Sequence, residues 1–141
     1  MLTSTRKATQ SAKAVAPRRF VFLLLDRFTM LSFASAVEPL RIANRVGGET
    51  VYTWALAGEN GETAVCSNGT AFKLDMGLEE IGRDDILLVC GGIDVQRATT
   101  KGVLNWLRRE ARRGVTVGGL CTGAYTLAKA GLLDGKKATI H

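Results

Sequence analysis

The segment GVTVGGLCTGAYTLAKAG, residues 114–131, places Cys121 between a short apolar run and a helix-like stretch. The run VTVGGL at 115–120 does not alternate polar with apolar residues, which is typical of a strand buried on both faces of a parallel sheet. Gly119 and Gly123 give the cysteine the G-x-nucleophile-x-G spacing of a nucleophile elbow. The segment therefore predicts a strand, a sharp turn at Cys121 and a helix.

Two further apolar runs, FVFLLL at 20–25 and DILLVC at 85–90, also read as buried parallel strands. Helical spacing of apolar residues predicts helices over 31–46 and 100–113, each followed by glycine. Pro39 lies inside the first of these, so we expect a late start or a bend. Residues 50–76 are strand-like and are split by the turn signals ENG and SNG.

Strands that alternate with helices predict an α/β fold, an open three-layer sandwich with a mostly parallel sheet. Such sheets bind ligands at the carboxyl ends of their strands. Residues 26–29, Gly91 with Gly92, and Cys121 all follow predicted strands, so we expect them at one pocket mouth.

Cys121 has the surroundings of a reactive thiol, because a following helix directs its N–H groups and positive end at the sulfur. Gly91 and Gly92 are candidates for an oxyanion nest beside Thr122, and His141 is a candidate base. The alternative is an inert cysteine that acts as a small apolar side chain. We interpret Cys66 and Cys90 as core or strand residues.

The net charge of +6 comes mostly from the first nineteen residues, which contain five basic side chains and no acid. The rest of the chain has fourteen basic and thirteen acidic residues and is nearly neutral. Residues 1–19 are rich in small polar residues, and we expect a basic flexible leader. A transit peptide has a similar composition. The arginines at 108, 109, 112 and 113 fit a solvated helix end better than a nucleic-acid site.

Three cysteines without a CxxC pair and a single histidine predict neither a disulfide framework nor a metal site. No apolar run approaches the roughly 18 residues of a membrane span, and no signal-peptide core is present. We therefore expect a cytoplasmic protein that acts without a cofactor.

The stretches FVFLLLDRFTMLSFASAVEPLRIAN, DILLVCGG and GGLCTGAYTLAKAGLLDGKKATIH resemble the ThiJ/PfpI superfamily, whose fold is like that of class I glutamine amidotransferases. The likeness is strongest to the amino-terminal domain of GlxA-type AraC-family transcriptional regulators. It covers residues 18–141 and implies a flavodoxin-like sandwich, an elbow cysteine at Cys121 and a homodimer. His141 matches the histidine that follows the elbow in this superfamily.

Enzymes of the superfamily commonly place an acidic side chain of the first helix beside the cysteine. Counted back six residues from Glu38, that place holds Ser32 in this chain. A serine hydroxyl is a poor proton shuttle near neutral pH, so the pocket has kept the elbow and lost part of the catalytic machinery. The candidate catalytic residues are Cys121 and His141, and the candidate ligand contacts are Ser32, Glu38, Gly91, Gly92, Cys121 and Thr122.

The resemblance thus favours a ligand-sensing domain of a transcriptional regulator that binds a small metabolite near the elbow and is not primarily an enzyme. The alternative is a cysteine-dependent hydrolase, isocyanide hydratase or deglycase. Because the sequence ends at residue 141, before such a sandwich is complete, we expect residues 20–141 to be an incomplete sensor domain. DNA binding would then require a C-terminal helix-turn-helix region that this chain lacks.

Overall fold

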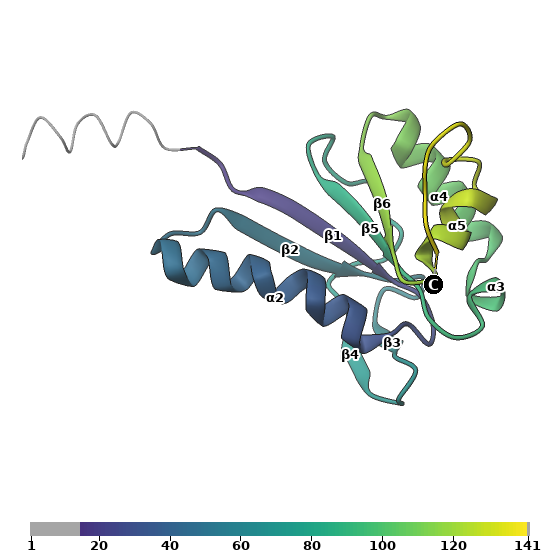
Figure 1. The fold of residues 1–141 in the computed structure, drawn as a ribbon, viewed down its shortest axis with the longest axis horizontal. Helices are drawn as coiled ribbons and strands as arrows, with labels where there is room; N and C mark the ends of the chain where they lie inside the picture. Colours follow the sequence, from purple (N-terminus) through teal and green to yellow (C-terminus); the bar gives the residue numbers. More distant parts are fainter. Residues whose placement is uncertain (1–14, 141) are drawn as a thin grey trace, which may run out of the picture.

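The computed structural model describes residues 15–140, which form a parallel sheet covered by helices on both faces (Figure 1). Four strands run side by side in the order β2-β1-β5-β6, and all three pairings are parallel. The predicted α/β sandwich with a mostly parallel sheet is therefore confirmed. The strands are β1 (Arg18–Leu24), β2 (Tyr52–Ala57), β3 (Thr63–Val65), β4 (Ala71–Lys73), β5 (Ile86–Cys90) and β6 (Thr116–Leu120), and the helices are α2 (Met30–Gly47), α3 (Val95–Ala98), α4 (Lys101–Arg112) and α5 (Gly123–Lys129).

The central strands β1 and β5 form the core because their side chains are apolar on both faces. Val21, Phe22, Leu23, Leu87 and Val89 are completely buried. This burial explains why the runs at 20–25 and 85–90 show no polar alternation. β1 begins at Arg18, so Arg18 and Arg19 lie in the strand and not in the predicted leader. Residues 1–14 of that leader are outside the described part of the chain.

Helix α2 covers one face of the sheet through aromatic packing. The ring of Phe33 meets those of Phe22, Phe28 and Phe72 edge-to-face, at centroid distances of 5.3–5.9 Å. The helix is continuous from Met30 to Gly47, so the expected late start is wrong. Pro39 is exposed, and so is the residue at position 35, whose carbonyl loses its donor. Water can therefore satisfy that carbonyl.

Helices α4 and α5 cover the other face, as Figure 1 shows. α4 buries Val103, Trp106 and Leu107 against the sheet, and the side chain of Thr100 caps its first turn by accepting a bond from Val103 N (3.2 Å). Its bounds lie within one residue of the predicted range. The short helix α3 was not predicted, because four residues are too few to show a helical period.

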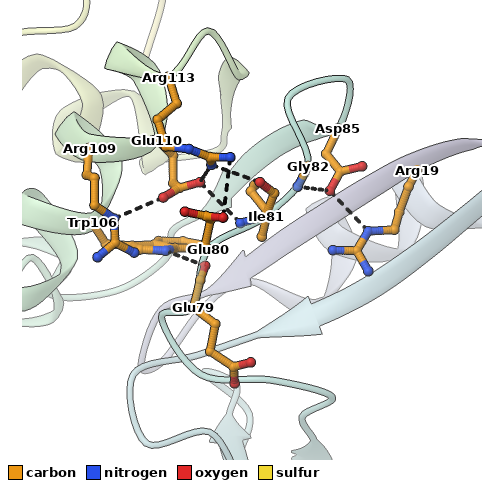
Figure 2. A network of polar contacts seen from close by, with 10 residues as sticks. All are labelled: Arg19, Glu79, Glu80, Ile81, Gly82, Asp85, Trp106, Arg109, Glu110 and Arg113. Atoms are coloured by element: carbon orange, nitrogen blue, oxygen red, sulfur yellow. Dashed lines mark hydrogen bonds and ion pairs between the residues drawn. The ribbon is translucent and has the colours of Figure 1, made fainter.

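A buried charge holds α4 at the amino-terminal edge of the sheet (Figure 2). The Glu110 side chain is fully buried and accepts from Arg113 Nη1 (2.5 Å), Arg109 Nε (3.0 Å) and the amide of Ile81 (3.2 Å). Trp106 Nε1 also donates to the carbonyl of Glu79 (2.8 Å). These bonds join α4 to the loop that leads into β5, so this network serves the fold.

Candidate functional site

Cys121 lies at the turn between β6 and α5, in a backbone conformation that few side chains adopt. Its φ is +55°, in the left-handed region. The turn brings α5 directly against β5, because Gly123 has no side chain: a Cβ there would collide with the carbonyl oxygen of Val89. A Cβ on Gly119 would lie 2.9 Å from Ala124 N. The glycines on both sides of the cysteine are therefore required by close packing, and β6 turns sharply into α5 at Cys121.

The loops after β1, β5 and β6 meet around the cysteine. Thr29 Oγ1 lies 3.6 Å from Cys121 Sγ, and Thr29 N donates to the carbonyl of Gly91 (3.0 Å). Thr122 Oγ1 donates to the carbonyl of Gly92 (2.8 Å). The carboxyl ends of three neighbouring strands are thus joined by hydrogen bonds. The structure brings Gly91, Gly92, Cys121 and Thr122 together at one edge of the sheet.

Thr29 belongs to the segment 26–29 that the sequence placed at the pocket mouth, but it was not among the predicted ligand contacts. It is the N-cap of α2, yet its side chain makes no capping bond, and its hydroxyl faces the sulfur. The sequence signal was a threonine directly before the helical stretch, which ordinarily indicates a cap. Only the side-chain conformation distinguishes a capping hydroxyl from one that contacts the thiol.

Ser32 and Glu38 occupy different surroundings from Thr29. Ser32 Oγ donates to the carbonyl of Thr29 (3.0 Å), so its hydroxyl is engaged one turn back along α2. Glu38 lies further along the helix and is exposed, and its carboxylate pairs with Arg41 through two bonds of 2.8 and 2.9 Å. Hydrogen bonding to the Arg41 guanidinium lowers the pKa of Glu38. Neither side chain has a hydrogen bond to Cys121 in the described structure.

The backbone groups of Gly91 and Gly92 are largely engaged within the fold. Gly91 N donates to the carbonyl of Leu120 (3.3 Å), so this N–H is not free to receive an oxyanion. A Cβ on Gly92 would collide with the carbonyl oxygen of Arg27. These glycines therefore allow the loops after β1 and β5 to approach closely. His141, the candidate base, is outside the described residues.

The other two cysteines are core residues with different environments. Cys66 is buried and its thiol donates to Asn68 Oδ1 (2.8 Å). Cys90 is completely buried, and this burial, with a smaller effect of the neighbouring Cys121, raises the pKa of the Cys90 thiol. Because thiolate is the nucleophilic form, Cys90 is protected both by burial and by protonation.

We expect selective alkylation of the native protein at Cys121. Cys121 is partly exposed, whereas Cys66 and Cys90 are buried. Under native conditions iodoacetamide should label Cys121 at least about tenfold faster than the other two, because buried thiols react only after local opening. Peptide mass spectrometry over a time course measures the three rates, with the denatured chain as the reference. Comparable native labelling of Cys90 would contradict the burial described above.

Of the residues described, none forms a cluster of three or more His, Cys, Asp or Glu side chains placed to hold a metal ion. In the same part of the chain, no helix combines the length and the apolar character that a bilayer crossing requires.

A parallel sheet with helices on both faces and a cysteine at a strand-to-helix elbow defines a particular class of α/β protein. Residues 18–141 match the DJ-1/PfpI family, and the chain belongs to this family. The resemblance inferred from the sequence is thereby confirmed.

Several of the proteins that are similar to this chain are transcriptional regulators, and another is an isonitrile hydratase of Pseudomonas putida, which is 34% identical over 76 residues (53% of this chain, 33% of the hydratase). The chain is 42% identical over 125 residues to the HTH-type transcriptional regulator GbdR of Pseudomonas aeruginosa UCBPP-PA14, covering 89% of this chain and 34% of GbdR. It is 45% identical over 122 residues to CdhR of P. aeruginosa PAO1, covering 86% of this chain and 36% of CdhR. The chain thus spans about a third of these regulators.

A solved AraC family transcriptional regulator structure from Pseudomonas putida has the same fold. The TM-score is 0.73 at 30% sequence identity, with 89% of this chain and 67% of that chain covered.

Proposed function

We propose that this chain is the ligand-sensing part of a cytoplasmic transcriptional regulator, and that a small metabolite binds where the loops after β1, β5 and β6 meet at Cys121. The observation that carries the proposal is the pairing of Cys121 with a threonine hydroxyl. Among the described residues, Thr29 contributes the side-chain hydroxyl that contacts Cys121 Sγ. A hydroxyl can donate a hydrogen bond to a ligand or accept one from it. The similarity to HTH-type regulators supports the same assignment.

The site has retained the elbow without an acidic partner for the thiol. A cysteine-dependent hydratase or hydrolase needs a group that moves a proton near neutral pH, and a threonine or serine hydroxyl is poorly suited to that task. Ser32, which the family pattern places at the acid's position, is bonded to a backbone carbonyl. Binding is therefore favoured over turnover. DNA recognition would belong to a separate region, and dimerisation would transmit the bound state to it.

Substitutions at Cys121 distinguish sensing from catalysis. We expect Cys121→Ser, which preserves size and polarity, to keep metabolite binding within about threefold, and Cys121→Leu to weaken it at least about tenfold because the larger side chain would occupy the proposed ligand's place beside Thr29. Thermal unfolding with a panel of quaternary amines measures binding, and circular dichroism verifies that both variants fold. Cys66→Ser, the same substitution at a buried cysteine whose thiol bonds to Asn68 and not to Thr29 or Cys121, is the matched control.

The same variants show what would refute the sensing assignment. Turnover of isocyanides or reactive aldehydes that Cys121→Ser abolishes would establish an enzyme. Equal metabolite binding by Cys121→Leu and the unsubstituted chain would place the ligand away from the elbow.

A further inference from the structure

A cavity of about 750 Å³ lies at the carboxyl ends of β1 and β2. Its walls come from the end of β1, from the segments that follow β2, and from α3 with the start of α4. Leu23, Leu25 and Val103 are buried core residues that give it an apolar floor. Cys121 does not line it, so this space is separate from the group of residues described above. Its volume lies within the range of small-molecule sites, roughly 300–1,000 Å³.

Five of the side chains that line the cavity are charged, and only two of these five form an ion pair with one another. Arg27 Nη1 and Asp94 Oδ2 form an ion pair of 3.0 Å that joins the loops after β1 and β5. Glu59 accepts a bond from Thr100 Oγ1 (2.6 Å). Within residues 15–140, Asp26 and Arg97 have neither an ion pair nor a side-chain hydrogen bond. Asp26 and Glu59 therefore have carboxylate oxygens that can accept hydrogen bonds from a ligand. The guanidinium of Arg97 can donate to one.

The Arg27–Asp94 pair is held in place by an unusual backbone. Arg27 and Asp94 have φ of +61° and +54°, a conformation that is uncommon for residues other than glycine. Arg27 N donates to the carbonyl of Val65 (2.8 Å), and Ile93 N donates to the carbonyl of Arg27 (3.2 Å). These backbone bonds hold the two loops in place, so Arg27 and Asp94 are positioned to form their ion pair before a ligand binds.

We infer that this cavity binds a small zwitterion, with its ammonium group at Asp26 and Glu59 and its carboxylate at Arg97. A guanidinium suits a carboxylate because it can donate two parallel bonds, and carboxylates are the natural acceptors for an ammonium group. The apolar floor accommodates the carbon chain between the two charges. None of the described residues that line the cavity is aromatic, which favours a hydrogen-bonding ammonium group over a quaternary one. The inference does not depend on metabolite binding at Cys121.

A series of ω-amino acids tests the inference, because it varies the separation of the two charges. We expect glycine, 4-aminobutyrate or 6-aminohexanoate to raise the Tm of the chain, by roughly 5 °C at ten times its Kd. Butylamine and butyrate each carry one of the two charges and should bind at least about tenfold more weakly than the best zwitterion.

Substitutions of exposed residues test whether the Tm shift arises from binding in this cavity. Arg97→Gln should weaken zwitterion binding at least about tenfold while leaving butylamine binding unchanged, and Asp26→Asn should weaken both. Arg112→Gln, an exposed arginine on α4 outside this cavity, is the matched control. Cys121→Leu should retain zwitterion binding, so failure of the elbow proposal is distinguishable from failure of this one.

Two results would overturn the inference. One is the absence of a Tm shift with every member of the ω-amino acid series. The other is zwitterion binding of equal strength in the unsubstituted chain and in Arg97→Gln.

Discussion

Gly123→Ala should destabilise the protein by at least about 3 kcal/mol and lower its Tm by roughly 10 °C. The added methyl group would meet the carbonyl oxygen of Val89 in the centre of the sheet, and neither backbone can move away without separating α5 from β5. Thermal or urea unfolding followed by circular dichroism measures the loss. Because native domains have only about 5–15 kcal/mol of stability, this loss would be a large share of the total.

Gly47→Ala is the matched control for this prediction. A Cβ at position 47 would have no atom within 4 Å, and the residue lies in the last turn of α2. This substitution should therefore be neutral or stabilise the chain by about 0.5 kcal/mol, since alanine favours helix more than glycine. If Gly123→Ala were as well tolerated as Gly47→Ala, the close approach of α5 to β5 would be wrong.

Glu110→Gln should cost about 2 kcal/mol at pH 7, and this cost should disappear in acid. Burial raises the pKa of Glu110, but the bonds from Ile81, Arg109 and Arg113 outweigh it and leave the pKa below the ordinary value of 4.5. The carboxylate therefore contributes stability above the pKa of the unfolded chain. That contribution is lost as the pH falls through the lower pKa of the folded chain.

Urea unfolding of both proteins between neutral and acidic pH measures this effect. The free energies of unfolding should differ at pH 7 and converge as the pH falls below the ordinary value of 4.5 and through the lower pKa of Glu110 in the folded chain. Glu80→Gln is the control, because Glu80 is 73% exposed and lies 3.7 Å from Arg113, and it should change stability by less than about 0.5 kcal/mol. A constant difference between Glu110→Gln and the parent at every pH would show that the charge contributes nothing.

The sequence predicts the central strands β1 and β5 well because burial on both faces leaves a clear pattern. The same interpretation is wrong for β6, which is the edge strand of the described sheet and whose residues are half-buried or exposed. The runs that became β1, β5 and β6 are continuous and apolar, and the glycine spacing around Cys121 is a local property of the chain. Helix α2 was also predicted, but the effect of Pro39 was not. Whether a freed carbonyl faces water depends on the position of the helix on the sheet, which the sequence does not state.

The site was harder to predict because its contacts depend on side-chain direction and on distant loops. The sequence places Thr29 before α2, but it does not show that its hydroxyl contacts Cys121 in place of capping the helix. The cavity combines residues from 23 to 103 whose charges have no shared motif. Asp94 and Arg27, which are 67 positions apart, become partners only after the sheet has formed.

Because the Thr29 side chain does not cap α2, the stability of the helix and the surroundings of the Cys121 thiol can change independently. A threonine that caps a helix cannot be replaced without a loss of about 1 kcal/mol, so its chemistry is constrained by folding. In this chain the Thr29 hydroxyl makes no capping bond. Natural variation or design at residue 29 can therefore retune the surroundings of the thiol while helix α2 keeps its stability, and related sequences can diverge in ligand preference without diverging in fold.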